Sequence, residues 1–372
     1  MTDAPPPPPP PRRLTPQEAL RLLEEADLVD LGRRADAVTR RLHPEPWRTY
    51  AIDRNINFTN VCRCRCRFCA FWRRPGDPEA YVLSDSALDA KVEEAVRLGA
   101  THILAQGGLH PDLGLAFYEN LLRRLKERFA VAMHCFSPPE ICHLAAREGL
   151  SVRTVLERLR AAGLDSLPGG GAEILVDRVR RLISPNKCTA GEWLDIMRTA
   201  HALGLPTTAT MVFGHVETSA ERIEHLRLVR DLQDETGGLP ARLEAKPRAG
   251  RHGFLSFIAW PFQAGRTELA RGGGLPPGWR PTSGAEYLRL VAVARLFLDN
   301  VPNLQASWVT MGTKIGQVAL AFGANDLGST MIEENVVAAA GCVHRASPEV
   351  LGRLIRGAGF EPRQRNSRYE IL

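Results

Sequence analysis

Short β-rich runs alternate with amphipathic helical runs along most of the chain, and this alternation limits the folds that the chain can adopt. Parallel strands need a crossover connection, usually a helix, so the pattern is typical of a parallel sheet. From residue 50 onward it gives eight strands with intervening helices, over at least the roughly 250 residues of a usual (β/α)8 barrel. The sequence therefore predicts an α/β fold, a single TIM-type barrel.

The expected strands place the barrel within residues 50–345. They lie at residues 51–58, 101–105, 130–136, 164–167, 207–213, 254–260, 304–309 and 324–326. In such barrels the chemistry takes place at the C-terminal ends of the strands, on the loops that follow them. Residues that directly follow a strand are therefore the first candidates for function.

Extensions are expected on both sides of the barrel. A proline run makes residues 1–14 a disordered tail. Thr15 and Glu18 predict a capping box, with which an N-terminal helical extension, residues 15–49, begins. Residues 346–372 form a C-terminal extension.

The composition provides for one large core and shows no membrane segment. The 372 residues are 44% hydrophobic. No apolar run approaches the roughly 18 residues of a membrane span, and the N-terminus lacks the apolar region of a secretory signal, so we expect a cytoplasmic protein. The net charge of +6 comes mostly from arginines interleaved with acids. That pattern favours a solvated charged surface over nucleic-acid binding.

Four of the eight cysteines lie within eight residues, directly after the first expected strand. Three of them, Cys62, Cys66 and Cys69, have C-x3-C-x2-C spacing, so their thiolates can converge on one soft metal centre. Three thiolates can hold three irons of a [4Fe–4S] cluster and leave the fourth iron open to a reactant. Cys64 does not belong to this pattern, and we expect its thiol to point away from the cluster.

A structural zinc site is the alternative for this loop, because four cysteines would satisfy tetrahedral zinc. Such sites usually take paired ligands from separated loops, whereas these thiols crowd one loop and no second C-x2-C or H-x3-H follows in the sequence. The spacing therefore favours the iron–sulfur cluster. The other cysteines are scattered and are expected to be small buried hydrophobes: Cys135, Cys142, Cys188 and Cys342.

Glycine-rich segments follow the second and fourth expected strands. The glycines of Gln106-Gly107-Gly108 let a ligand approach the backbone, whose N–H and C=O groups can bind it. Gly169-Gly170-Gly171 exposes bare backbone in the same way, and Glu173 can accept hydrogen bonds from ribose hydroxyls. A simple turn is the alternative at both places.

Further candidates lie close to other strand ends. The catalytic candidates are His134, His215 and Glu217. His134 is either a pocket group or a satisfied histidine of the barrel interior. Acids near the last strand can accept a proton or hold hydroxyls, or serve only as helix-dipole partners: Asp326, Glu333 and Glu334.

The cysteine loop, with an aromatic residue just before its last cysteine, resembles that of the radical S-adenosylmethionine (SAM) enzymes. The resemblance implies that the three spaced cysteines hold a [4Fe–4S] cluster whose open iron is chelated by the amino and carboxylate groups of SAM. It implies that Phe68 packs near the adenine and that a glycine-rich segment after the second strand binds SAM. The cofactor-binding candidates are Phe68, Gln106, Gly107, Gly108, Ser137, Gly170 and Glu173.

Longer runs resemble a narrower group, the radical SAM enzymes of the futalosine route to menaquinone. These runs are residues 53–62, 106–113, 136–140, 168–175 and 183–188. Within the group, the runs similar to the cyclic dehypoxanthinyl futalosine synthases are residues 208–218, 305–309, 323–326 and 333–335. The resemblance spans about residues 50–341.

This resemblance implies a radical cyclisation. One electron from the reduced cluster cleaves SAM, the 5′-deoxyadenosyl radical takes a hydrogen from the sugar of dehypoxanthine futalosine, and the sugar radical adds to the benzoate ring. Loss of an electron and a proton then restores aromaticity. The implied partners are this small-molecule substrate and an electron donor that the sequence does not identify.

Other functions remain open at this point. Aminofutalosine synthase is the closest alternative, followed by the more distant deazaflavin-cofactor radical SAM synthases. A non-catalytic iron–sulfur or zinc-binding protein is the alternative from a different class.

Two segments depart from the resemblance. Residues 239–253 look like an insertion between a helix and the sixth strand, which places them on the bottom face of the barrel, away from the chemistry. In Phe257-Ile258-Ala259-Trp260 the group more often has proline at the third position.

Overall fold

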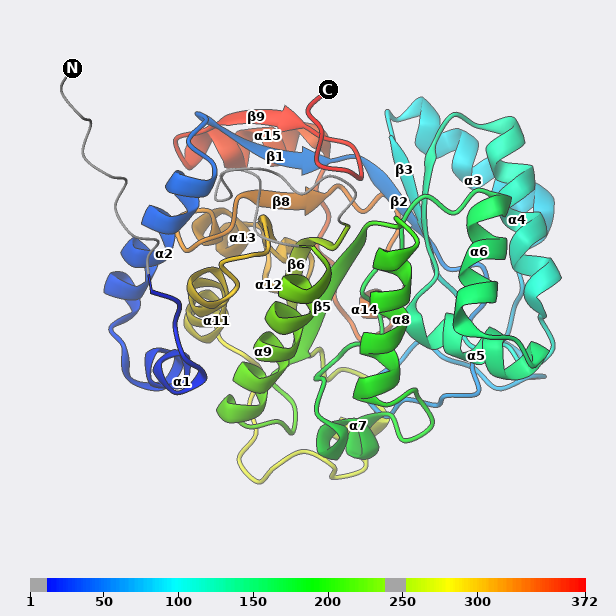
Figure 1. Ribbon diagram of the computed structural model, residues 1–372, viewed down its shortest axis with the longest axis horizontal. Helices are drawn as coiled ribbons and strands as arrows, with labels where there is room; N and C mark the ends of the chain where they lie inside the picture. Colours follow the sequence, from blue (N-terminus) through cyan, green and yellow to red (C-terminus); the bar gives the residue numbers. More distant parts are fainter. Residues whose placement is uncertain (1–11, 238–251) are drawn as a thin grey trace, which may run out of the picture.

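Parallel strands form the wall of a barrel in the computed structural model of the chain, which describes residues 12–237 and 252–372 (Figure 1). Hydrogen bonds join the strands in two sets, in the orders β5-β6-β7-β8-β1-β9 and β2-β3-β4, and all the strand pairings are parallel. The strands are β1 (Trp47–Ala51), β2 (Asp53–Ile56), β3 (His102–Ala105), β4 (Ala132–Cys135), β5 (Thr207–Phe213), β6 (Phe254–Pro261), β7 (Asn303–Gln305), β8 (Asp326–Ser329) and β9 (Glu361–Gln364).

The two sets of strands join at two places and so close the barrel. β1 pairs with β8, and β2, which continues the same segment, pairs with β3. On the other side, Ser166 bridges to His134 in β4 and Leu167 bridges to Thr207 in β5. The predicted (β/α)8 barrel is confirmed. Its fourth wall segment is reduced to these bridges because Pro168, which has no N–H to donate, and three glycines follow at once.

Three predicted strands differ most from the structure in their limits. The first, residues 51–58, is divided into β1 and β2, with a shift of register between Thr49 and Ala51. The seventh, residues 304–309, ends at Gln305. The reason is that the N–H of Ser307 donates to the hydroxyl of Tyr287 at 2.6 Å, and a helix begins at the next residue. The eighth begins later, at Asp326.

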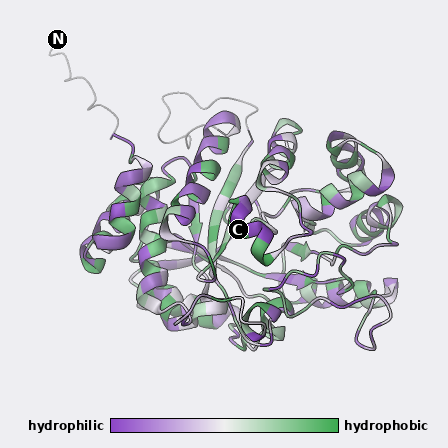
Figure 2. Cartoon of the chain, turned by 90° about the horizontal axis from the view of Figure 1, so that it is seen from below, coloured by the Kyte–Doolittle hydropathy of each residue, from purple (hydrophilic) through white to green (hydrophobic). Residues whose placement is uncertain are grey.

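Helices surround the strands, and Figure 2 shows hydrophobic and hydrophilic residues sharing each of the longer ones. They are α1 (Pro16–Glu25), α2 (Leu28–Leu42), α3 (Asp85–Arg97), α4 (Leu115–Arg128), α5 (Pro138–Glu148), α6 (Val152–Ala162), α7 (Asp177–Ile183), α8 (Ala190–Ala202), α9 (Ser219–Thr236), α10 (Glu268–Arg271), α11 (Gly284–Phe297), α12 (Trp308–Met311), α13 (Thr313–Ala319), α14 (Val336–Ala339) and α15 (Pro348–Gly357). α1 begins with the predicted capping box of Thr15 and Glu18.

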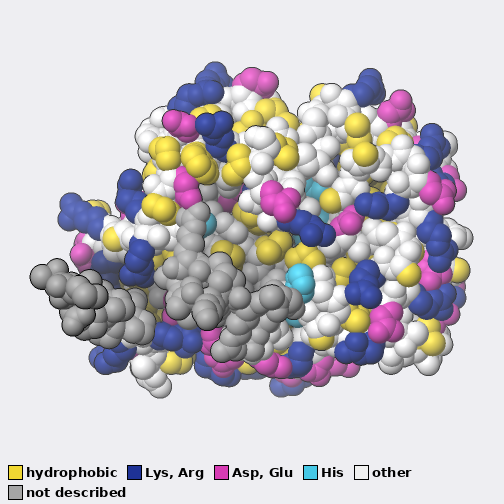
Figure 3. All heavy atoms as spheres, turned by 45° about the horizontal axis from the view of Figure 1, so that its top comes forward, with side chains coloured by type: hydrophobic (Ala, Val, Ile, Leu, Met, Phe, Trp, Pro, Cys, Tyr) yellow, Lys and Arg dark blue, Asp and Glu magenta, His cyan; other side chains and the backbone are white. Residues whose placement is uncertain are grey.

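The N-terminal extension lies against the barrel helices, since α1 packs on α9 and α2 on α11. On the face drawn in Figure 3, basic and acidic side chains are interspersed, as expected for a solvated charged surface. None of the described helices is long and apolar enough to cross a membrane. Most of the predicted insertion, and residues 1–11 of the tail, lie outside the described residues, so the bottom-face placement stays a prediction.

The C-terminal extension forms part of the barrel. β9 pairs with β1, and Arg365, the residue after β9, reaches Asp326 at the start of β8. The two nitrogens Nε and Nη2 of Arg365 lie 2.5 and 2.9 Å from the carboxylate oxygens of Asp326, and the Thr49 hydroxyl donates to the same carboxylate at 2.5 Å. This buried ion pair lies at the N-terminal ends of the strands, which we call the floor of the barrel.

We predict that Arg365→Leu lowers the free energy of unfolding by about 3–5 kcal/mol, because it leaves the buried Asp326 carboxylate without its counter-charge. Denaturant titration of the cluster-free protein measures the change. Arg363→Leu, two residues earlier, breaks an exposed pair with Glu361 and a contact with the Trp47 ring, and should cost about 1 kcal/mol. Equal losses in the two variants would contradict the structural role of the buried pair.

Candidate active site

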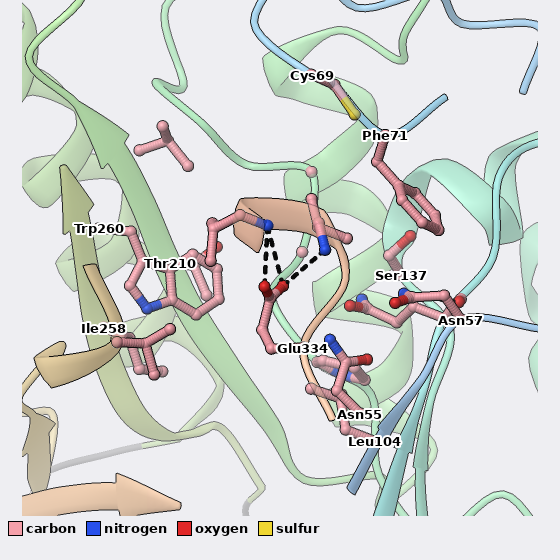
Figure 4. A pocket seen from close by; sticks show the side chains of 18 of the residues that line it. Asn55, Asn57, Cys69, Phe71, Leu104, Ser137, Thr210, Ile258, Trp260 and Glu334 are labelled. Carbon is pink, nitrogen blue, oxygen red and sulfur yellow. Dashed lines mark hydrogen bonds between the residues drawn. The ribbon is translucent and has the colours of Figure 1, made fainter. Parts of the chain in front are cut away.

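A cavity of about 380 Å³ fills the barrel interior, from the cysteine loop at the C-terminal ends of the strands down to the floor. In Figure 4, Cys69 and Phe71 lie at one end of the cavity and Asn55 at the other, with Trp260 and Ile258 on one side. Strands β2 to β8 all contribute to its wall, as do the loops that follow most of them. The cavity is therefore open to the residues that the strand-end rule selects.

The cysteine loop lines the mouth of this cavity. Cys62, Cys66 and Cys69 are all on its wall, and the sulfur of Cys62 accepts the N–H of Leu109 at 3.3 Å. The expectation that Cys64 points away is wrong. Arg65 adopts a φ of 49°, which reverses the loop, and the Cys64 thiol lies buried between Cys62 and Cys66. Hydrogen bonding from that thiol lowers the pKa of Cys62 to about 6.

The donor set of the loop fits a [4Fe–4S] cluster. A cubane takes each of its three thiolates on a different iron, so its ligands surround a space instead of meeting at one atom. Within residues 12–237 and 252–372, no three His, Cys, Asp or Glu side chains are gathered around a single metal position. Cys62, Cys66 and Cys69, which line the wall of one cavity, match the first arrangement.

A buried ion pair lies beside the cysteine loop. The ammonium of Lys187 is 2.7 Å from one carboxylate oxygen of Glu173 and 5.2 Å from the centroid of the Phe68 ring. Burial opposes its charge, but the neighbouring Cys66 and Glu173 raise the pKa of Lys187 well above its usual value. The second oxygen of Glu173, Oε2, lies 3.9 Å from the guanidinium of Arg180 and has no hydrogen-bond partner among the described residues. An acceptor in this state can take a hydroxyl of a ligand.

The glycines after β3 and after the fourth wall segment allow close packing between loops. A Cβ on Gly108 would lie 2.3 Å from the carbonyl oxygen of Val61, and one on Gly107 would lie 2.4 Å from the Phe58 ring. A Cβ on Gly170 would lie 2.6 Å from the side-chain nitrogen of Gln106. The sequence analysis predicts that these glycines let a ligand approach the backbone. In the structure they let the cysteine loop and the cavity wall pack closely together.

Glu140, which the sequence analysis did not assign, organises this part of the wall. Its two carboxylate oxygens accept the N–H of Gly107 at 3.0 Å and the hydroxyl of Ser137 at 2.6 Å. Burial raises the pKa of Glu140 to about 8. Gln106 and Ser137 both line the cavity, as their positions after strands predict.

His134 lies on the cavity wall, below the mouth. Its Nδ1 is 2.7 Å from the Ser166 hydroxyl, and burial together with the nearby His102 lowers the pKa of His134 to about 3. The imidazole is therefore neutral at physiological pH. It can orient a substrate by hydrogen bonding.

The structure does not bring His215 and Glu217 to the cavity. Both side chains are fully buried and paired with each other, with Nδ1 of His215 2.9 Å from the carboxylate. His215 and Arg222 outweigh the effect of burial and lower the pKa of Glu217 well below its usual range. Their hydrogen bonds fix the loop after β5, and this placement does not support the prediction that they are catalytic.

Several cavity residues were not selected from the sequence. They include Asn55, Lys187, Ser256, Trp260, Arg365 and Tyr369. Asn55 and Ser256 lie inside strands, where period-two alternation marks inward-facing positions but not polar function. Arg365 and Tyr369 follow the barrel in the chain, and no local signal shows that they fold back into it.

A parallel barrel whose first strand runs into a C-x3-C-x2-C loop defines a radical SAM enzyme. Residues 56–229 match the radical SAM superfamily, and residues 251–372 match the CofH/MqnC C-terminal region. The barrel is similar to that of methylornithine synthase (TM-score 0.70, 16% identity, 95% of each chain covered).

Among curated relatives, the chain is 45% identical to the cyclic dehypoxanthine futalosine synthase of Halalkalibacterium halodurans, over 97% of this chain and 92% of that one. It is 44% identical to the Streptomyces coelicolor protein of the same name, over 97% and 86%. It is also 39% identical to the 5-amino-6-(D-ribitylamino)uracil–L-tyrosine 4-hydroxyphenyl transferase of Methanopyrus kandleri, over 96% and 90%. The chain belongs to the cyclic dehypoxanthine futalosine synthase family.

We predict that Gly108→Ala displaces Cys62, since the new Cβ would also lie 2.8 Å from the Cys62 Cβ. Overpacking of this kind costs about 1–3 kcal/mol, and iron bound after anaerobic reconstitution should fall below the wild-type value. Gly191→Ala is the control because its Cβ would meet nothing within 4 Å. Wild-type iron content in Gly108→Ala would show that the loop tolerates the displacement.

Proposed function

We propose that this enzyme converts dehypoxanthine futalosine to cyclic dehypoxanthinyl futalosine, a step of menaquinone biosynthesis. The observation that carries the proposal is identity of 44–45% to two synthases of that name over 97% of the chain. The deep cavity under the cysteine loop supports it, because a radical reaction needs a site from which bound ligands can exclude solvent.

In this proposal the cysteine loop and the neighbouring residues bind the two cofactors that start the reaction. Cys62, Cys66 and Cys69 hold a [4Fe–4S] cluster which, with SAM bound, supplies a 5′-deoxyadenosyl radical. Glu173 accepts a ribose hydroxyl of SAM through Oε2, which has no hydrogen bond of its own but pairs with Arg180 at 3.9 Å, while Lys187 holds its other oxygen. Phe68, between the last two cysteines and over Lys187, packs near the adenine.

The rest of the wall holds the substrate. Ile258, Trp260 and Trp308 offer apolar surface for the aromatic ring, and His134 with Gln106 offers hydrogen bonds to polar groups. In balance, the substrate loses two hydrogens. One is transferred to the 5′-deoxyadenosyl radical, which becomes 5′-deoxyadenosine. The other leaves as a proton, and its electron would go to the cluster, which the cleavage of SAM leaves oxidised by one electron. The reductant that starts the reaction is an electron donor still to be identified.

The proposal predicts the products of anaerobic turnover with SAM, dithionite and dehypoxanthine futalosine. Mass spectrometry should find 5′-deoxyadenosine and a product lighter than its precursor by two hydrogens. Some relatives are named as transferases that act on 5-amino-6-(D-ribitylamino)uracil and L-tyrosine, so this pair should be tested as substrates in the same assay. Turnover of that pair, or incorporation of adenosyl into the product as in aminofutalosine synthase, would overturn the proposal.

Glu173→Gln should weaken SAM binding by about tenfold, since a neutral amide accepts a weaker hydrogen bond than a carboxylate. Equilibrium binding of SAM to the reconstituted, unreduced enzyme measures this. Glu221→Gln is the matched control, because Glu221 caps α9 and pairs with Arg178 at the surface. Unchanged SAM affinity in Glu173→Gln would exclude the proposed contact.

A further inference from the structure

The last residues of the chain form a hairpin under the barrel. Arg365 bridges to Ile371 in antiparallel fashion, and the N–H of Leu372 donates to the carbonyl of Gln364 at 3.0 Å. The Asn366 side chain holds the turn by accepting the N–H groups of Arg368 and Glu370. We call residues 364–372 the floor hairpin.

The floor hairpin places Tyr369 in the cavity at a cost in backbone conformation. Tyr369 has a φ of 64°, in the left-handed region that a bulky residue rarely adopts. Its ring lies 3.8 Å from the guanidinium of Arg365, and together with Ser367 it lines the lower end of the cavity. Such conformations persist where surrounding structure imposes them, and they cluster at functional sites.

Three buried polar atoms that lack a well-formed hydrogen bond face this lower end. They are the hydroxyl of Tyr369, the hydroxyl of Ser256 in β6 and Oδ1 of Asn55 in β2. The hydroxyls of Tyr369 and Ser256 interact with each other, but no hydrogen bond of good geometry joins any of the three atoms to a described residue. They come from three separate elements and line the same cavity. Buried polar atoms are ordinarily satisfied, so these three together indicate a place for hydrogen-bonding groups of a ligand.

The charges of the floor indicate what kind of ligand group fits. Asp53 accepts the Ser329 hydroxyl and lies 3.2 Å from Nε2 of His102, and Asp326 holds both Nε and Nη2 of Arg365. The remaining nitrogen of Arg365, Nη1, donates to the carbonyl of Asn366. A carboxylate of a ligand would therefore be repelled by Asp53 and Asp326, and the guanidinium of Arg365 is already hydrogen-bonded to protein groups. Neutral hydroxyls, which both donate and accept, suit the three unpartnered atoms.

We infer that Tyr369, Ser256 and Asn55 form a subsite for the sugar hydroxyls of the substrate, and that the floor hairpin is a substrate-recognition element. The inference rests on the proposed function, which supplies a substrate with a hydroxylated pentose at one end and a benzoate at the other. The pentose hydroxyls lie against the floor. The pentose carbon that gives up a hydrogen faces the mouth, where SAM binds. The benzoate lies beside the pentose, along the apolar wall of Ile258 and Trp260.

Binding of dehypoxanthine futalosine to the reconstituted enzyme with SAM and without reductant tests this subsite. Tyr369→Phe and Ser256→Ala should each raise the dissociation constant by about five- to tenfold, the effect of one lost hydrogen bond. An analogue with a 2-deoxypentose in place of the pentose should bind more weakly to the wild type. For at least one of the two variants, the loss of affinity relative to the wild type should be smaller with this analogue than with the natural substrate.

Tyr118→Phe is the matched control. The Tyr118 hydroxyl is likewise buried without a partner, but Tyr118 is not on the cavity wall, so its removal should leave substrate affinity unchanged. SAM affinity should stay at the wild-type value in Tyr369→Phe and Ser256→Ala, which separates a substrate contact from a general loss of structure.

Two outcomes overturn the inference, and they differ. Wild-type substrate affinity in both floor variants overturns the subsite while leaving the proposed function intact. A wild-type enzyme that neither binds nor converts dehypoxanthine futalosine overturns the proposed function, and the subsite with it.

Discussion

The carboxylate of Asp326 connects three distant parts of the chain. It accepts the Thr49 hydroxyl from β1, the N–H of Gly328 from its own strand and two nitrogens of Arg365 from the C-terminal segment. Because the group is buried, each of these partners is needed to offset the loss of water. The position where the first and last barrel strands meet, and the direction in which the chain leaves β9, both follow from this one charge.

At the mouth of the barrel, two glycines hold the structure together, as the Asp326 carboxylate does at the floor. The absence of a side chain at Gly107 and Gly108 lets the loop after β3 lie against the cysteine loop, and Glu140 then holds Gly107 and Ser137 in place. The mouth is therefore built by backbone contact and the floor by charge. The cavity between them has an apolar side and a polar side, which suits a substrate with an aromatic and a hydroxylated end.

Features that depend on local spacing could be read from the sequence. The three cysteines, the capping box of Thr15 and Glu18, and the strand β5 lie where the pattern puts them. The strand-end rule also selected Gln106 and Ser137, which line the cavity. It failed for His215 and Glu217, since position after a strand does not determine which way a side chain points. Tyr369 could not be found at all, because its place depends on the pairing of β9 with β1, about three hundred positions earlier in the chain.

The pairing of β1 has a consequence for the order in which the molecule is made. β1 is among the first strands to be synthesised, yet its partners are β8 and β9, which end at Ser329 and Gln364. The barrel therefore cannot close while the ribosome still holds the C-terminal segment, and contacts of such long sequence separation form slowly. Until then the loop with its four thiols has no enclosed interior beneath it. Delivery of iron and sulfide is thus best timed after release of the finished chain.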